Sequence, residues 1–217
     1  MHTVQYYNCK DAGDLAAFCQ GLAELIHEKA GGSRTLCLLC IGSDRATGDC
    51  LGPLVGHKYR QLNKERRKIR PRSGLRPVYI YGSLKKPVHA GNLKSTLNEI
   101  GAKHPDACII AVDASLGVSH HVGLVTIREG GLRPGLGIGK DLPSVGDISI
   151  TGIVGISKAG AKRSYPEETP EINEFLASQE QLMLNYTSLQ TTRLCVVMDL
   201  ADAICKGLQF AFCCLEK

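Results

Sequence analysis

The stretch from Leu36 to Val55 constrains the fold more than any other part of the chain. Its first residues, up to Ile41, are all apolar, and this run stops at Gly42. A short polar segment follows, and the apolar pattern resumes at Leu51 with a proline close behind. This order is typical of a buried strand, a tight polar loop and a helix with proline in its first turn. In open α/β sheets, loops at the carboxyl ends of strands carry the functional groups.

The remaining segments alternate between helical and strand patterns. Helices are predicted over 11–29, from 51 into a basic segment, and over 92–103, 171–185 and 192–212. Strands are predicted over 36–41, 77–81, 106–112, 122–128 and 147–154. The strand at 106–112 closes on Asp113, and its continuous apolar character predicts a parallel central strand covered on both faces. The order predicts an α/β sandwich with a mainly parallel centre, formed by one domain over residues 1–217.

The cysteines and the apolar segments restrict the class of protein. No window approaches the roughly 18 uninterrupted apolar residues of a membrane span, and the N-terminus has no secretory pattern. We therefore expect a cytoplasmic protein with no membrane partner. The ten cysteines are scattered, which favours reduced thiols over a disulfide framework. Cys37 and Cys40 have C-x-x-C spacing, but on a strand they would point to opposite faces and could not share a zinc ion.

The net charge of +5 comes largely from the basic run at 64–72. Such a run could bind nucleic acid or an acidic partner. No aromatic residue is interleaved with these charges, and cations at the end of a helix complement its dipole. We therefore interpret the run as a solvated helix end and expect no nucleic-acid partner.

Two acids follow two strongly predicted strands. Asp49 comes after the first strand across its polar loop, and Asp113 ends the central strand. If these strands are neighbours, both carboxylates reach one crevice, where they could share a proton, polarise water or hold a divalent cation. Asp44 and Asp147 could join them. Acids at strand ends also serve as caps and turn formers, so a structural role stays open.

A metal site is a further hypothesis. His120 and His121 follow Asp113 closely, and one of them could add a nitrogen ligand to the two carboxylates. The candidate ligand set is Asp49, Asp113 and His121, and a divalent metal ion is the candidate cofactor.

Four motifs resemble the YyaC-type sporulation proteins of spore-forming bacteria. The motifs are Cys40 to Gly56, Ala111 to Gly117, Val145 to Val154 and Leu189 to Leu194. That family is similar to the germination protease, which degrades small acid-soluble spore proteins, and more distantly to hydrogenase maturation endopeptidases. The resemblance implies a three-layer α/β/α sandwich around a mostly parallel twisted sheet, of the phosphorylase/hydrolase-like kind. The segment 157–180 looks like a surface insertion relative to the family pattern.

The resemblance also implies site residues. Asp49 and Asp113 match the two aspartates that are the proposed catalytic pair of the germination protease. In the hydrogenase endopeptidases the corresponding acids and a later histidine hold nickel. His120 and His121 stand too close to Asp113 in the sequence to match that histidine.

The leading hypothesis is a sporulation-associated peptidase in the cytoplasm of the sporulating cell. Asp49 and Asp113 would activate water, and the expected substrate is a protein or peptide, with acidic spore proteins as candidates. Supporting roles, in shaping the loop, binding substrate or lining the crevice, are predicted for Asp44, Arg45, Asp147 and Thr151. Two alternatives stay open: a non-catalytic binding or scaffold protein that keeps the peptidase fold, and an endopeptidase that recognises a metal in its substrate. A homo-oligomeric state is left open as well.

Overall fold

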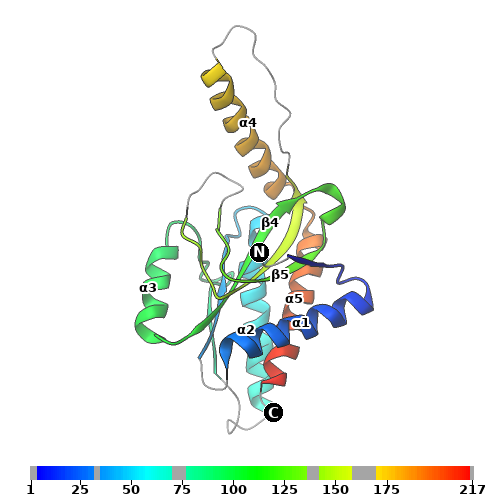
Figure 1. Cartoon of the computed structure of the whole chain (residues 1–217), viewed down its shortest axis with the longest axis vertical. Coiled ribbons are helices and arrows are strands. Elements are labelled where there is room, and N and C mark those ends of the chain that lie inside the picture. The colour runs from blue at the N-terminus through cyan, green and yellow to red at the C-terminus, as the bar shows by residue number, and fades with distance from the viewer. Residues whose placement is uncertain (1–3, 32–34, 70–76, 136–141, 158–169, 216–217) are drawn as a thin grey trace.

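The computed structural model describes residues 4–31, 35–69, 77–135, 142–157 and 170–215 (Figure 1). A six-stranded sheet has the order β1-β5-β6-β4-β2-β3. Its strands are β1 (Gln5–Tyr7), β2 (Leu36–Cys40), β3 (Val78–Tyr81), β4 (Cys108–Gly117), β5 (Val125–Glu129) and β6 (Ile148–Ile156). The helices are α1 (Ala12–Ala30), α2 (Leu51–Ile69), α3 (Leu93–Lys103), α4 (Pro170–Gln190) and α5 (Leu194–Cys214), with short 3-10 turns η1 (Gly48–Cys50) and η2 (Ser119–His121).

The centre of the sheet is parallel, as predicted. β6, β4, β2 and β3 run parallel to their neighbours in that order, and β1 and β5 are antiparallel. A parallel centre needs both faces covered, because its strands are apolar on both sides. The predicted α/β class is therefore confirmed, with a mixed sheet whose central strands are parallel.

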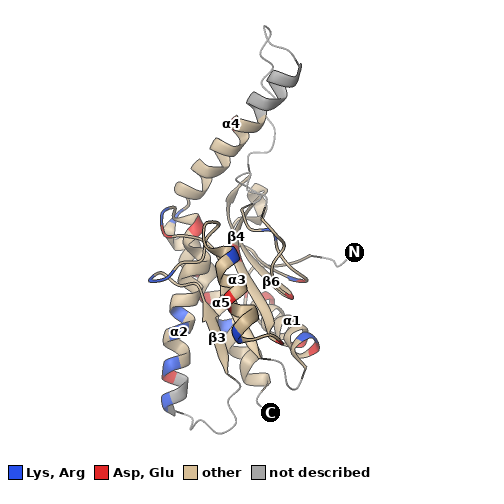
Figure 2. Cartoon of the chain, turned by 90° about the vertical axis from the view of Figure 1, so that its left-hand side faces the viewer, with Lys and Arg blue, Asp and Glu red and all other residues tan. Residues whose placement is uncertain are grey.

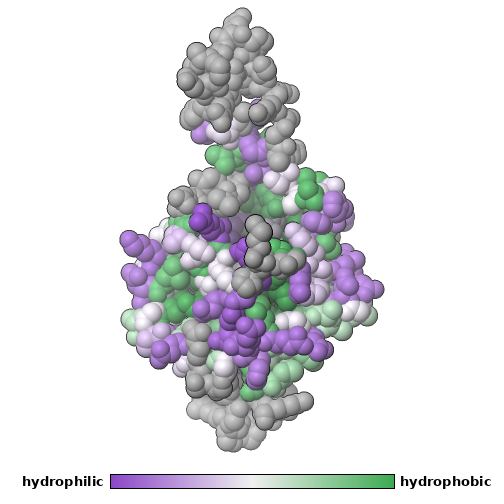
Figure 3. Space-filling view, in the orientation of Figure 1, coloured by the Kyte–Doolittle hydropathy of each residue, from purple (hydrophilic) through white to green (hydrophobic). Residues whose placement is uncertain are grey.

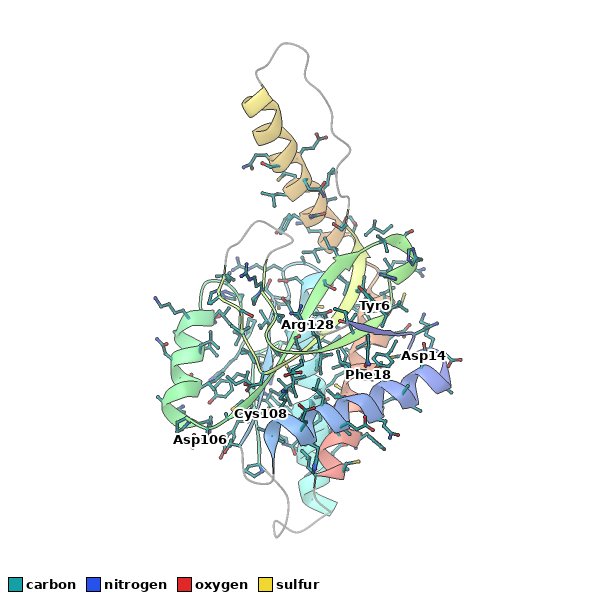
Figure 4. All side chains as sticks on the ribbon, in the orientation of Figure 1. Tyr6, Asp14, Phe18, Asp106, Cys108 and Arg128 are labelled. Atoms are coloured by element: carbon teal, nitrogen blue, oxygen red, sulfur yellow. The ribbon has the colours of Figure 1, made fainter. Side chains whose placement is uncertain are left out.

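Strand β2 shows how the two faces are buried. Leu36 and Leu38 pack into the larger core with α1, α2 and α5, whereas Cys37 and Leu39 pack into a smaller core with α3. This alternation follows from the two-residue period of a strand. Figure 4 shows Phe18 of α1 directed toward the sheet, where its ring meets Tyr7 at 5.6 Å. The chain is therefore a three-layer sandwich.

The cysteines behave as small apolar residues. Every cysteine is a free thiol, and Cys37 and Cys40 lie in different cores on opposite faces of β2. Burial raises the pKa of the Cys37 thiol to about 11 and raises that of Cys40 further. The C-x-x-C pair is therefore two core residues rather than one half of a zinc site.

Several boundaries differ from those predicted. β4 continues four residues beyond Asp113, so this acid lies inside the strand instead of at its end. β1 was not predicted, because three residues give too short a pattern to recognise. Of the proposed insertion at 157–180, residues 158–169 lie outside the described part. Ser157 directly follows β6, and residues 170–180 belong to α4, which extends away from the body of the molecule (Figure 1).

In the part of the chain that the structure describes, no helix is long and apolar enough to cross a membrane. The basic residues predicted at 64–72 begin on α2, where Figure 2 shows blue and red segments along the same helix. In Figure 3, hydrophilic residues cover much of the front face, with hydrophobic patches between them.

Two helical glycines should respond oppositely to alanine. A Cβ at Gly52 in the first turn of α2 would lie 2.0 Å from the Ile41 carbonyl oxygen, whereas at Gly101 in α3 no atom lies within 4 Å. Gly52→Ala should therefore lower the free energy of unfolding by about 1–3 kcal/mol or more. Gly101→Ala, the matched control, should raise it by about 0.5–1 kcal/mol. Urea denaturation measures both, and a neutral Gly52→Ala would contradict the packing described.

Candidate functional site

A cleft opens at the carboxyl ends of β2 and β4, on the face of the sheet that carries α3. It consists of two adjoining cavities of about 270 and 360 Å³. Both cavities are lined by Asp49, Asp113, Gly135 and Leu189. The structure thus brings the two acids of the sequence hypothesis into one cleft, at the edge where parallel sheets place their sites.

Asp49 is held by the loop that leaves β2. Gly42 has a φ of +130°, and a Cβ there would lie 2.0 Å from the Asp49 carbonyl oxygen, so only glycine allows the loop to close. One carboxylate oxygen of Asp49, Oδ2, accepts hydrogen bonds from the Ser43 amide at 2.7 Å and the Ser43 hydroxyl at 2.9 Å. The loop therefore fixes the orientation of this carboxylate.

Asp113 lies in β4 beside Thr151 of β6 and is 8% exposed. Its Oδ1 accepts a hydrogen bond from the Ala114 amide at 2.8 Å. Burial, followed by the negative charge of Asp49, raises the pKa of Asp113 well above its usual value. Asp113 therefore keeps its proton at pH values where an exposed carboxyl would have lost it.

The second oxygen of each acid is available to a ligand. Within the described residues, nothing donates a hydrogen bond to Asp49 Oδ1 or Asp113 Oδ2. Since the cleft reaches both side chains, a water or a substrate group can contact them. One carboxyl that holds a proton beside one that accepts hydrogen bonds is an arrangement suited to general acid–base chemistry.

The two loop residues predicted to support the site have different positions. Asp44 and Arg45 are both exposed, but only Arg45 lines the first cavity. The charge of Asp44, after burial and Asp49, contributes to the raised pKa of the Cys50 thiol. Cys50 is therefore the opposite of an activated nucleophile, since its thiol is held protonated.

Of Thr151 and Asp147, both expected to line the crevice, only Thr151 does so. Thr151 lines the second cavity, and its hydroxyl lies 2.7 Å from that of Thr126 on β5. Asp147 precedes β6 at the other end of the sheet, where its Oδ2 accepts from the Ile109 amide at 2.8 Å. The residues described along the two cavities do not include Asp147, so the structure gives it a role in joining β4 to β6.

The histidine of the candidate metal set lies elsewhere. His121 belongs to η2, and its ring packs on Tyr6 with centroids 4.3 Å apart. It lines a neighbouring cavity of about 210 Å³ rather than the two that hold Asp49 and Asp113. In the described part of the chain, no group of three or more His, Cys, Asp or Glu residues is placed to hold a metal ion. The set Asp49, Asp113 and His121 therefore does not fit a metal.

Several residues of the cleft were not identified as site residues by the sequence analysis, among them His89, Tyr186 and Leu189. His89 lines the first cavity, and its Nδ1 accepts from the Gly91 amide at 3.1 Å. It follows Val88, which bridges to Ile41, so its position after β3 was the signal that could have found it. Tyr186 and Leu189 come from the end of α4, and no local pattern indicates that this helix returns to the cleft.

Comparison with known proteins gives a family and a relative. The family described as "Protein of unknown function (DUF1256)" matches residues 6–162. The chain is also similar to the "Uncharacterized protein YyaC" of Bacillus subtilis (strain 168), with 36% identity over 204 residues. This alignment covers 94% of the chain and 82% of that relative. Similarity to YyaC is thus confirmed, and the wider similarity to the germination protease stays a prediction.

Asp113→Asn should make the protein more stable at neutral pH. Folding raises the pKa of Asp113 above the 3.8 of the unfolded chain, so its ionisation costs stability as pH rises through the raised pKa and costs nothing below about pH 4. Each unit of pKa corresponds to about 1.4 kcal/mol, or about 3–5 °C in Tm. Thermal unfolding from pH 3.5 to 8 should show the gap between variant and parent widen with pH. A pH-independent gap would contradict the assignment.

Proposed function

We propose that this chain, which belongs to the DUF1256 family of proteins of unknown function, is a peptidase. The observation that carries the proposal is the unequal pair of carboxyls in one cleft. Asp113 is buried with its pKa raised, and Asp49 is hydrogen-bonded to Ser43. Neighbouring carboxyls in different environments separate into an acid and a base, which amide hydrolysis requires.

The reaction follows from this division of roles. Asp49 removes a proton from a water molecule while the oxygen of that water attacks the carbonyl carbon of the peptide bond. Asp113 donates its proton to the carbonyl oxygen, which gives a tetrahedral diol. The diol then returns a proton to Asp113 as the carbonyl reforms, Asp49 delivers its proton to the leaving nitrogen, and the C–N bond breaks. Both acids end in their starting states, and the products are a carboxylic acid and an amine.

Charge at the rim of the cleft supports an acidic protein or peptide substrate. Arg45 lines the first cavity and Arg133 the second, and both are exposed. Neither forms an ion pair with another described residue. Two such arginines can attract and orient acidic side chains. Acidic spore proteins in the cytoplasm of a sporulating cell are the substrates that we propose.

A binding or scaffold protein is the second candidate. The hydrogen bonds from Ser43 to Asp49 Oδ2 favour it, because they show that this carboxylate also closes the loop after β2. The open cleft and the available second oxygens favour the peptidase. A metal-recognising endopeptidase is not proposed, because His121 lies apart from the acids.

Removing either acid should slow cleavage strongly. We expect Asp49→Asn and Asp113→Asn to lower kcat/KM for small acid-soluble spore proteins by about 10²–10⁴, the usual contribution of a positioned general acid or base. Asp44→Asn is the matched control, because Asp44 is exposed on the same loop and does not line either cavity. Cleavage is followed by mass spectrometry of the fragments. Absence of cleavage by the unmutated protein under every activation condition would favour the scaffold.

The pH dependence of cleavage should report the proton on Asp113. Because this carboxyl acts as the acid and its pKa is raised, the rate should fall as pH rises through that pKa. Measurement of kcat/KM between pH 4 and 9 gives the alkaline limb of the profile, whose apparent pKa belongs to the coupled pair. A rate that climbs steadily to pH 9 is incompatible with Asp113 as the proton donor.

A further inference from the structure

The two central strands of the cleft differ in length. β2 and β4 pair in parallel from Leu36 beside Cys108 to Cys40 beside Val112, and the Ile41 amide adds a last bond to the Val112 carbonyl. β4 then continues to Gly117 while the chain after β2 turns away at Gly42. The extension stays paired with β6 on its other side. Beyond Val112, one edge of β4 has therefore lost its strand neighbour.

The backbone groups on this edge can be identified from the alternation of the strand. Val112 faces β2, and Gly117 faces β6, because its carbonyl accepts from the Ser157 amide. Ala114 and Leu116 therefore present their amide and carbonyl groups to the vacated side. The Ala114 amide donates to Asp113, which leaves the Ala114 carbonyl and both backbone groups of Leu116 without a partner among the described residues.

The edge borders the cavity that holds the acids. The cavity of about 360 Å³ is lined by Ala114, Ser115 and Leu116 together with Asp49 and Asp113. Ala114 and Leu116 are half-buried, and the unpaired backbone groups of a sheet edge most readily pair with another extended chain. Within the described residues, this edge carries one free amide donor and two free carbonyl acceptors. These groups can form hydrogen bonds with the backbone of a short extended peptide.

We propose that the substrate binds as an added strand on the edge of β4 from Ala114 to Leu116, in the line that β2 leaves at Gly42. This inference rests on the proposed function and names its substrate class, an extended segment of polypeptide. The Leu116 amide donates to a peptide carbonyl, and the Ala114 and Leu116 carbonyls accept from peptide amides. The peptide backbone then passes beside Asp113, where the scissile bond meets the two acids.

The walls of the cavity fit such a strand. Successive side chains of a strand point to opposite faces, so alternate residues of the peptide would face Leu132 on the α3 side and Leu189 on the other. Leu189 belongs to α4, and Leu132 belongs to the segment that follows β5. Both are apolar, so the peptide side chains at these two positions are expected to be apolar as well.

Peptide binding can be tested separately from cleavage. A library of random decapeptides is passed over immobilised Asp113→Asn, and the best-retained peptide is synthesised with each amide N-methylated in turn. Strand addition predicts that methylation at alternate amides weakens binding about three- to tenfold, while the amides between them tolerate it. Retention of no peptide, or an effect without the two-residue period, overturns the proposal.

A change in the protein gives a second test. Leu116→Pro removes the amide on the open edge, and proline is tolerated on edges that need no ladder bond. Its affinity for the same peptide should fall about three- to tenfold, whereas Val118→Pro, on an exposed residue just beyond the strand with a φ of −73°, should bind as the parent does. Circular dichroism establishes that both are folded, and if Leu116→Pro is not, the methylation series decides.

The outcomes separate this inference from the peptidase. Periodic binding without cleavage by the unmutated protein keeps the added strand and rejects the peptidase. Cleavage without periodic sensitivity to methylation keeps the peptidase and rejects the added strand.

Discussion

Close contact between backbones at the end of β2 is the constraint on which the rest of the structure depends. The carbonyl of Ile41 lies against Gly52 of α2, and the carbonyl of Asp49 lies against Gly42. Any side chain at these two positions would push the helix away from the strand. With glycine in both places, the start of α2 packs closely against the end of β2. The single turn η1 directly precedes α2 and places the Asp49 carboxylate in the cleft.

The electrostatic character of the site follows from this packing. Asp49 lies on a turn whose Ser43 supplies two donors, whereas Asp113 lies inside a strand with a single donor from Ala114. Two chemically identical side chains therefore differ in their surroundings, and burial together with the negative charge of Asp49 raises the pKa of Asp113. The protein accepts a cost in stability to bury Asp113, which is a common feature of functional sites.

Much of the arrangement could be predicted from the sequence, because its signals are local. The apolar run of β2, the glycines after it and the acids that follow the two apolar runs predicted the fold class and the Asp49–Asp113 pair. Asp147 was expected in the crevice, but it lies just before β6, at the end of the sheet away from the cleft. The sequence does not show this position, which is fixed by the hydrogen bond from the Ile109 amide to the Asp147 carboxylate. His121 was expected beside Asp113 because the two residues are close in sequence. Sequence distance does not determine the direction of its side chain, which packs on Tyr6 instead. The contribution of α4 depends on a long-range contact that no periodicity encodes.

The unequal lengths of β2 and β4 have a consequence for how such a sheet could gain or lose its site. If β2 ran four residues further, its backbone would form hydrogen bonds with the open edge of β4. No backbone group on that edge would then remain for a partner chain. Gly42, where the chain turns away just after β2, thus decides whether the last pairing of this sheet is made inside the molecule or with another one.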